Sequence, residues 1–324
     1  MTERIRWGIL STANIARTEV IPAIQQSRNG VVAAVASRDL GRAQAFAQEL
    51  GIPTAYGSYQ DLIDDPNIEA IYNPLPNSEH AIWSIRCAQA GKPVLCEKPL
   101  ASNADEAETM VRRFAERGLL LAEAFMYRYH PQTEQVKAML EAGAVGELRV
   151  IEASFSFAIR SEDDIRLNKD LAGGALMDVG CYCVNLMRLM TGEEPQTVQA
   201  MARFGERSGV DETLTGLLDF PSGVLGHFDC SLRAQFKSGY EIRGSQGRIL
   251  VEHGFRVEAD REPVIRHWQG SRYEEIRVAA ANAYTLMVED FAEALLKRRP
   301  LRFPAADAVG NMATIDRLLA AARE

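Results

Sequence analysis

Short apolar runs alternate with helix-like segments over the N-terminal part of the chain, and this alternation constrains the fold more than any other feature. The runs are nearly continuous, which is typical of strands buried on both faces of a parallel sheet. They lie at residues 5–10, 31–36, 70–73, 94–96 and 119–122, with helical patterns at 14–27, 40–50, 78–90 and 103–117. This spacing predicts βαβ units in a doubly wound α/β domain. Pro22 lies inside the first helical pattern, so we expect a kink or an irregular turn there.

The pattern changes from about Glu147, where polar and apolar residues partly alternate in short stretches. Turn signals such as Pro221-Ser222-Gly223 separate these stretches, which predicts an α+β domain with a mainly antiparallel sheet. The expected strands lie at 147–159, 196–204, 212–220, 223–232, 239–243, 248–251, 263–268 and 273–278, and the expected helices at 175–190, 283–298 and 305–322. A chain of 324 residues suits about two domains, and we place them at residues 1–124 and 125–324.

The charge balance excludes several classes of protein. The chain has 36 Lys and Arg against 44 Asp and Glu, a formal net charge of −8, which argues against wrapping nucleic acid or docking on an anionic membrane. No apolar run approaches the length of roughly 20 residues that spans a bilayer, and the strand-like start leaves no room for a signal peptide. The five cysteines form no disulfide framework. We therefore expect a cytoplasmic protein with no nucleic-acid or membrane partner.

The histidines and cysteines do not indicate a metal site. The five His are scattered, and no H-E-x-x-H pattern is present. Cys181 and Cys183 would point to different sides of a helix, which makes them a poor pair of ligands. We expect no metal cofactor.

The first strand runs directly into a turn of small residues. A dinucleotide-binding (Rossmann) domain needs small residues here, because backbone amides at a helix N-terminus must approach the pyrophosphate. Against the usual G-x-G-x-x-G/A pattern the chain places Ser11, Ala13 and Ala16. An ordinary βα turn is the alternative, which the surrounding βαβ pattern disfavours. The expected cofactor contacts in this turn are Ser11, Thr12, Ala13, Asn14 and Ile15.

The end of the second predicted strand indicates which dinucleotide is bound. An NAD site usually has a carboxylate near this point to hold the ribose 2′-hydroxyl, whereas this chain has Ser37 followed by Arg38. Ser37 can hydrogen-bond a 2′-phosphate, and Arg38 can face it with a planar guanidinium. Asp39 is competing evidence, but it is better placed to cap the next helix. We expect NADP(H), with NAD less favoured; a solvated surface charge is the alternative role of Arg38.

Motifs along the rest of the chain resemble one known family. Two of them follow predicted strands at the carboxyl ends, where open α/β sheets bind ligands, and a third begins a predicted helix. They are Asn73-Pro74-Leu75-Pro76-Asn77 with His80, Glu97-Lys98-Pro99, and Gly173-Gly174 with Asp178, Gly180 and Tyr182. Together with residues 123–131, they resemble the glucose–fructose oxidoreductase, inositol dehydrogenase and rhizopine-catabolism (Gfo/Idh/MocA) family over essentially the whole chain. Tyr182, where many members have His, resembles the branch of glucose–fructose oxidoreductase, dihydrodiol dehydrogenase and NADP-dependent xylose dehydrogenase.

The resemblance implies a Rossmann domain, a second domain on a large open antiparallel sheet, and a cleft that holds the nicotinamide and a small polyol or sugar. It also implies that the sheet face forms a contact between copies of the chain. The cofactor contacts expected from the strand ends are Asn73, Pro74, Leu75, Asn77, His80, Glu97 and Lys98. His80 could instead be a structural histidine, and Glu97 is expected to stabilise its loop or contact ribose rather than perform chemistry.

Hydride transfer needs a group that moves a proton at the carbinol oxygen. A lysine ammonium beside a tyrosine stabilises the phenolate, so such a pair can work nearer neutral pH than free Tyr or Lys. We expect Lys98 and Tyr182 to be this acid/base pair, without assigning the proton to either. Asp178 lies one helical turn before Tyr182 and could orient Lys98, bind a substrate hydroxyl or complement the helix dipole.

Other residues are weaker candidates. Tyr127 and Arg128 could line the substrate pocket or pack at the domain junction, and Asn185 could face the same pocket or pack in its helix. The charged run 160–166 is expected to be a solvated loop, with a substrate lid as the alternative.

The predicted function is NADP(H)-dependent hydride transfer on a sugar (an aldose or anhydro-sugar) or a cyclic vicinal diol. One alternative is a redox-assisted glycosidase or isomerase that keeps NAD tightly bound. Another is a non-catalytic NADP(H)-binding regulator. The combination of Lys98, Asp178 and Tyr182 argues against the regulator, and Ser37-Arg38 weighs against the NAD-recycling enzyme.

Overall fold

The computed structural model describes residues 3–324, which form two compact units. One unit comprises the chain up to Met126 together with Tyr284–Val309, and the other comprises Tyr127–Ala283 together with Gly310–Glu324. Each unit is thus built from two segments of the chain. Whether 1–124 and 125–324 divide the cofactor and substrate roles stays a prediction.

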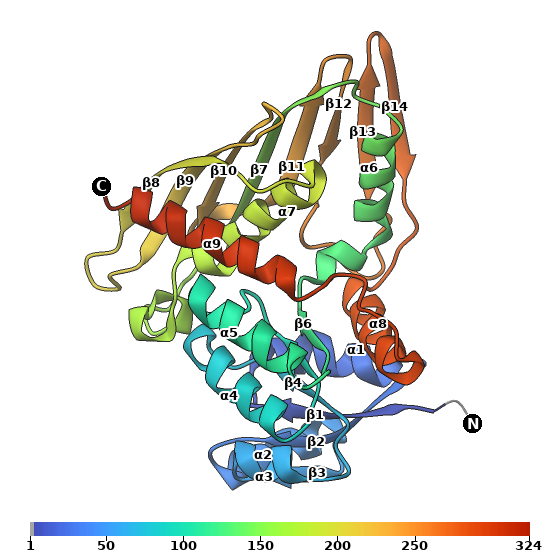
Figure 1. Ribbon diagram of the computed structural model, residues 1–324, viewed down its shortest axis with the longest axis vertical. Coiled ribbons are helices and arrows are strands. Elements are labelled where there is room, and N and C mark those ends of the chain that lie inside the picture. Colours follow the sequence, from blue (N-terminus) through green and yellow to red (C-terminus); the bar gives the residue numbers. More distant parts are fainter. Residues whose placement is uncertain (1–2) are drawn as a thin grey trace. The chain divides into compact units, whose positions relative to one another are not determined.

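The N-terminal unit holds a six-stranded parallel sheet in the order β3-β2-β1-β4-β5-β6 (Figure 1). Its strands are β1 (Ile5–Leu10), β2 (Gly30–Ala36), β3 (Thr54–Tyr56), β4 (Ala70–Asn73), β5 (Val94–Cys96) and β6 (Leu121–Glu123). Its helices are α1 (Ile21–Gln26), α2 (Leu40–Leu50), α3 (Tyr59–Asp64), α4 (Asn77–Gln89), α5 (Ala104–Ala115) and α8 (Ala283–Lys297). The order grows outward in both directions from β1, as in dinucleotide-binding folds, so the predicted α/β class is confirmed.

The centre of this sheet is buried on both faces. Every residue of β4 and β5 is buried, and the side chains of Trp7, Ile9 and Tyr72 have no exposed surface. Strands buried on both faces have continuous apolar sequences, and for this reason they could be predicted from the sequence.

The first predicted helix is irregular, as Pro22 led us to expect. A π-helical turn, η1 (Ala16–Val20), runs directly into α1, and Pro22, which has no N–H to donate, lies just after this turn. The short elements β3 and α3 were not predicted, because elements of this length carry too little periodicity.

The second unit holds an eight-stranded sheet in the order β14-β13-β12-β11-β7-β10-β9-β8. All neighbouring strands are antiparallel except β7 and β10, which confirms the predicted mainly antiparallel sheet. Its strands are β7 (Leu148–Ala158), β8 (Thr197–Phe204), β9 (Asp211–Asp219), β10 (Leu225–Ser231), β11 (Arg233–Gly244), β12 (Gly247–Val251), β13 (Val264–Gln269) and β14 (Arg272–Arg277). Its helical elements are η2 (Met126–Tyr129), α6 (Pro131–Glu141), η3 (Ile165–Leu167), η4 (Lys169–Leu171), the π-helical turn η5 (Leu176–Gly180), α7 (Cys181–Thr191) and α9 (Ala306–Ala321).

The two faces of this sheet differ in what covers them. Helices α7 and α9 run along one face, as Figure 1 shows, and the buried residues Leu214, Leu218 and Phe228 alternate with exposed ones on their strands. On other strand positions Met201, Leu217 and Leu225 are large, hydrophobic and exposed. The sheet is therefore open on one face in a single copy of the chain.

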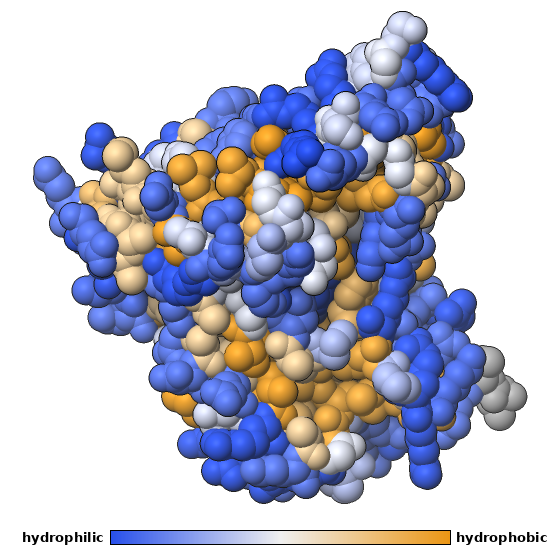
Figure 2. Space-filling model, turned by 45° about the horizontal axis from the view of Figure 1, so that its top comes forward, coloured by the Kyte–Doolittle hydropathy of each residue, from blue (hydrophilic) through white to orange (hydrophobic). Residues whose placement is uncertain are grey.

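Hydrophilic side chains predominate on the surface seen in Figure 2, and hydrophobic ones gather in patches between them. None of the helices formed by residues 3–324 has both the length and the apolar character needed to cross a membrane.

Candidate functional site

The turn after β1 has the features of an anion-binding helix start. Ser11 adopts a left-handed conformation with φ 70°, and its Oγ is buried without a hydrogen-bond partner among the described residues. The helix that follows begins at Asn14 and continues into the π-helical turn, which has no side-chain cap. The first amides of a helix have no partner within the helix. The Ala13 carbonyl oxygen accepts a backbone hydrogen bond from the Arg17 amide (3.1 Å). The turn thus offers donors and a hydroxyl to an external ligand.

Cationic side chains gather beside this turn at the end of β2. Ser37 is buried, and its Oγ accepts a hydrogen bond from the Asp39 amide (3.3 Å). Asp39 caps α2 by accepting from the Arg42 amide (2.7 Å), which confirms the capping role expected of it. The Arg42 guanidinium donates to Thr12 Oγ1 in the first turn (3.3 Å).

Arg38 and Arg42 lie close to the same phenol. Burial raises the pKa of Tyr59, and the positive charges of Arg38 and Arg42 oppose that rise. Two guanidinium groups therefore lie near the turn, where the sequence interpretation named only Arg38. Arg42 was missed because it lies in the first turn of α2, where an arginine is common on the surface.

The loop after β4 is held from inside the unit. The buried Asn73 side chain donates to Ser84 Oγ (3.0 Å) and accepts from the Leu75 amide (3.3 Å). Pro74 lies between Asn73 and Leu75, and Asn77 begins α4. The Asn73 side chain therefore shapes the loop, while the backbone of the loop lies at the carboxyl end of β4.

His80 links this loop to the next one. Its ring is fully buried, with Nε2 2.7 Å from the Leu75 carbonyl oxygen and Nδ1 2.9 Å from that of Pro99. Burial lowers the pKa of His80 to about 4, so the ring is neutral near pH 7 and donates its one N–H to one of these two carbonyl oxygens. Both ring nitrogens face backbone oxygens of the unit, which favours the structural alternative for His80 over a direct cofactor contact.

Lys98 is held by anchors on both sides of it in the chain. Glu97 accepts a hydrogen bond from the buried Tyr72 hydroxyl (2.7 Å), which raises the pKa of Tyr72 beyond the rise that burial causes. Pro99 contacts His80, as described above. The Leu100 amide donates to the buried Glu123 carboxylate (2.8 Å), a contact that the sequence interpretation missed because it joins the ends of two different strands. The backbone that carries Lys98 is therefore rigidly placed beyond β5.

In the second unit, Asp178 and Tyr182 lie on η5 and at the start of α7, one turn apart. Asp178 Oδ2 accepts a hydrogen bond from Arg166 Nε (2.8 Å). The start of this helix is capped by Asp211, whose Oδ2 accepts from the Leu176 amide (2.7 Å). Asp211 is buried, and burial raises its pKa to about 7. The sequence interpretation missed it because β9 lies far from the helix in sequence.

Tyr182 is set in a cluster of aromatic rings. Its ring centroid lies 5.2 Å from that of Phe155, 5.7 Å from Phe255 and 5.8 Å from Tyr127. Tyr127 in turn donates its hydroxyl hydrogen to Asn185 Oδ1 (2.7 Å). Arg128, next to Tyr127, is buried. The structure therefore brings Tyr127, Tyr182 and Asn185 together, and it adds Phe255, which no motif indicated.

The predicted site residues thus fall into two groups. One group, which includes Ser11, Ser37, Arg38 and Lys98, belongs to the N-terminal unit, and the other, which includes Asp178 and Tyr182, belongs to the second unit. The pairing of Lys98 with Tyr182 stays a prediction.

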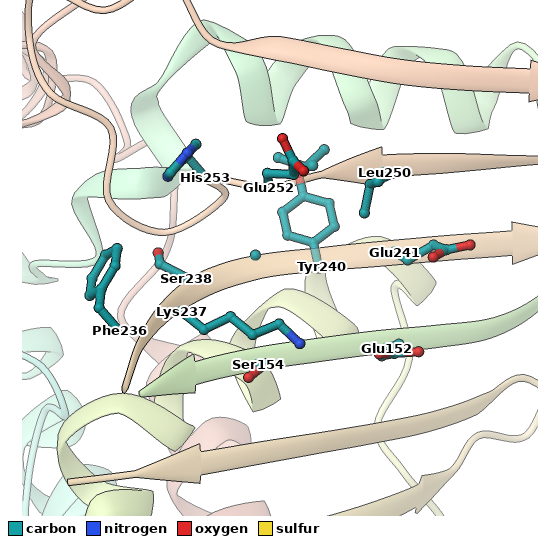
Figure 3. A pocket seen from close by; sticks show the side chains of 12 residues that line it. Glu152, Ser154, Phe236, Lys237, Ser238, Tyr240, Glu241, Leu250, Glu252 and His253 are labelled. Carbon is teal, nitrogen blue, oxygen red and sulfur yellow. The ribbon is translucent and has the colours of Figure 1, made fainter. Parts of the chain in front are cut away.

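A cavity of about 450 Å³ lies on the eight-stranded sheet along β7, β11 and β12 (Figure 3). Lys237 extends along it toward Ser154, and Glu152, Glu241 and Glu252 are among its other lining residues. Its lining includes neither Asp178 nor Tyr182, although its lining residue Tyr240 packs against Phe255 of the aromatic cluster, with ring centroids 6.0 Å apart. Within residues 3–324, no group of three or more His, Cys, Asp or Glu side chains is arranged to hold a metal ion.

Comparison with known families places both units. Residues 5–125 match an oxidoreductase family with an NAD-binding Rossmann fold, and residues 133–250 match the GFO/IDH/MocA C-terminal domain.

Individual relatives agree with this family assignment. D-xylose 1-dehydrogenase (NADP(+)) 2 of Haloferax volcanii is 40% identical over 311 residues, which cover 96% of this chain and 95% of that protein. Trans-1,2-dihydrobenzene-1,2-diol dehydrogenase of Mus musculus is 39% identical over 251 residues, 76% of this chain and 74% of that protein. The crystal structure of a 3-ketoreductase from Actinomadura kijaniata, in complex with NADP and TDP-benzene, has a TM-score of 0.94 and 32% identity, and the match covers 98% of each chain.

These matches extend over both units and agree with the parallel and antiparallel sheets described above. The predicted family, the fold class and the general class of oxidoreductase are confirmed. The chain belongs to the Gfo/Idh/MocA family of oxidoreductases.

Proposed function

We propose that this chain is an NADP(H)-dependent oxidoreductase that transfers hydride between the nicotinamide and a sugar (an aldose or anhydro-sugar) or a cyclic vicinal diol. The observation that carries the proposal is the mounting of Lys98 at the carboxyl end of β5, with Glu97, His80 and Glu123 fixing the backbone around it. A lysine held in this way is poised for chemistry on a ligand, whereas a surface lysine needs no such support. The names of the xylose and dihydrodiol dehydrogenases support the substrate class.

The residues of the N-terminal unit fit NADP(H). The buried, unpartnered Ser11 Oγ and the uncapped start of η1 suit the pyrophosphate. Ser37, Arg38 and Arg42 suit a 2′-phosphate, because guanidinium groups form strong charge-assisted hydrogen bonds with phosphate. Residues 73–77 and Glu97 would contact the rest of the cofactor. When bound, the nicotinamide supplies or accepts the hydride.

Lys98 and Tyr182 are proposed to handle the proton. In the oxidative direction the pair removes the proton from the substrate hydroxyl. In the reductive direction the pair donates a proton to the carbonyl oxygen. The Lys98 ammonium stabilises negative charge at the phenolate and at the substrate oxygen. Asp178 would bind a substrate hydroxyl or orient Lys98, and Tyr127 and Arg128 would contact the substrate.

The reaction is tested with aldoses, anhydro-sugars and vicinal diols, each assayed with NADP⁺ or NADPH by nicotinamide absorbance. We expect Lys98→Met and Tyr182→Phe to lower kcat/KM on the best substrate by about 100- to 1000-fold, since each removes a group that moves the proton. Lys137→Met, on the exposed face of α6, is the matched control and should leave kcat/KM unchanged. Full activity in Lys98→Met would refute the assignment. A chain that retains bound NAD and shows no absorbance change with any compound would favour the NAD-recycling alternative.

The cofactor is tested separately by binding. Arg38→Ala and Arg42→Ala should each weaken the binding of NADPH by about 10- to 100-fold and leave the binding of NADH nearly unchanged, because only NADPH carries the 2′-phosphate. Arg113→Ala, an exposed arginine on α5, is the control. Equal losses for both nucleotides would contradict the NADP(H) assignment. Fluorescence titration of the reduced nucleotides measures all of these constants.

We further propose that the open face of the eight-stranded sheet, with the exposed Met201, Leu217 and Leu225, forms a contact between two copies of the chain in a dimer or tetramer. Light scattering tests this, since a monomeric mass at micromolar concentration would exclude it. A cytoplasmic location likewise stays a prediction.

A further inference from the structure

We propose that Arg166 is a positioning residue for the reaction: its guanidinium holds the Asp178 carboxylate in the orientation that the substrate or Lys98 requires. This inference rests on the proposed function, in which Asp178 is part of the site. The sequence interpretation assigned Arg166 to a solvated loop, and no motif linked it to Asp178.

The ion pair has the geometry of a specific contact. Arg166 Nε lies 2.8 Å from Asp178 Oδ2, while Arg166 Nη1 lies 3.3 Å from Asp164 Oδ1 on the opposite edge of the guanidinium. The guanidinium carbon also lies 5.7 Å from the centroid of the Phe157 ring. Two carboxylates and an aromatic ring therefore confine the guanidinium, so it can act as a fixed support for Asp178.

The backbone fixes both ends of the pair through one turn. The Gly174 amide donates to the Arg166 carbonyl oxygen (2.8 Å), and the Asp178 amide donates to the Gly174 carbonyl oxygen (3.0 Å). Asp164 Oδ1 also accepts from the Arg166 amide (3.0 Å). The loop that carries Arg166 is thus bonded to the same residue that begins the helix carrying Asp178. The distance between the two side chains is set by the backbone rather than by chance rotation of exposed side chains.

The environment of this pair differs from that of an ordinary surface pair nearby. The side chains of Arg166 and Asp178 are 41% and 16% exposed. Arg207 and Asp163, by contrast, are 74% and 90% exposed and lie 3.5 Å apart. The negative charge of Asp178 is the main cause that raises the pKa of Arg166. Exposed ion pairs contribute little to stability. A partly buried ion pair at the site can instead fix the orientation of the Asp178 carboxylate.

Arg166 is partly open to solvent, so its loss can be repaired from outside. We expect Arg166→Ala to lower kcat by about 10- to 100-fold, as misplacement of a reacting group by about 1 Å does. Millimolar methylguanidinium should restore a large part of that kcat, and Arg166→Lys should retain more activity than Arg166→Ala. The double variant Arg166→Ala/Asp178→Asn should not respond to methylguanidinium, because the carboxylate that the ion would bind is absent. Arg207→Ala is the matched control and should equal the wild type with and without the ion.

The kinetic result is paired with a crystal structure of Arg166→Ala. The proposal expects the Asp178 carboxylate to leave its position or to occupy more than one rotamer. It is overturned if Asp178 keeps its position, if kcat stays within threefold of wild type, or if the lost activity is not restored by methylguanidinium. Failure of the proposed function looks different, because then the wild type itself turns over no compound of the panel, while the crystal structure still decides whether Arg166 positions Asp178.

Discussion

Two helix starts in this molecule share an unusual geometry and differ in how their amides are satisfied. In the N-terminal unit, η1 leads into α1, and in the second unit, η5 leads into α7; a π-helical turn lies near the start of each helix. π-Helical turns are rare and are found frequently at functional sites. The Ser11 hydroxyl in the turn before η1 has no hydrogen-bond partner among the described residues, whereas the buried Asp211 side chain accepts from the Leu176 amide at the start of η5.

This difference separates two ways of using a helix start. An uncapped start presents its backbone donors to an external anion, which suits a nucleotide pyrophosphate. At the second start, the Asp211 side chain engages the Leu176 amide, and the residues proposed to act are the side chains of Asp178 and Tyr182. In the proposed function, the first start binds the cofactor and the second carries acid/base residues.

The largest expected effect comes from the charge of Asp211. Its pKa is raised by burial to about 7 in the folded chain, so between about pH 4 and pH 7 the folded chain binds a proton that the unfolded chain has released. The contribution of Asp211 to stability is therefore fully present at low pH and is lost as pH rises through about 7, by up to roughly 4 kcal/mol. Asp211→Asn keeps an acceptor oxygen and removes the titration. Urea unfolding at several pH values should show the variant gaining stability relative to wild type from pH 4 to 8, and parallel curves would contradict this.

The next effect tests the tightness of the second turn. Gly174 has φ +126°, and a Cβ built on it would lie 2.2 Å from Asp211 Oδ1. Gly174→Ala should therefore reduce the free energy of unfolding by about 3 kcal/mol, because the backbone conformation and the clash both oppose it. Gly192→Ala is the control, since Gly192 also has a positive φ, +70°, but open space around it, and it should cost only about 1 kcal/mol. Equal losses in the two variants would show that Asp211 does not sit tightly against the turn.

The smallest effect comes from giving the first turn a carboxylate of its own. Ser11→Asp should weaken NADPH binding by about 30-fold, since the new charge would occupy the amides and repel the pyrophosphate. Ser11→Asn is the neutral control of equal size, and Asn tolerates the left-handed conformation of this position. Fluorescence titration gives both constants. If the two variants bind NADPH equally well, the first turn is not the anion site and the comparison of the two helix starts fails.

Parts of the fold and site could be predicted because they depend on residues close together in sequence. The continuous apolar runs located the central strands, Pro22 indicated the irregular start of α1, and Asp39 was correctly expected to cap α2. Ser37 and Arg38 are predicted to bind the cofactor from their place after β2, and that role stays a prediction. Each of these inferences uses a local pattern whose physical cause lies within a few residues.

Other features could not be predicted, because they join residues that are distant in the chain. Glu123 contacts Leu100 across two strand ends, Asp211 caps a helix start in a different segment, and Arg166 reaches Asp178 from a preceding loop. The sequence left His80 as either a cofactor contact or a structural residue. The structural role is favoured because both ring nitrogens lie against backbone carbonyl oxygens.

The sequence by itself therefore determined the family and the α/β and mainly antiparallel architecture, and it supplied the site residues that stay predictions. These depend on hydrophobic periodicity and on short motifs, which are local. Tertiary structure alone decided which groups support that chemistry and in what charge state: a neutral His80, a capping Asp211 with its pKa near 7, and an Arg166 turned toward Asp178. Burial and distance set these properties, and neither exists until the chain has folded.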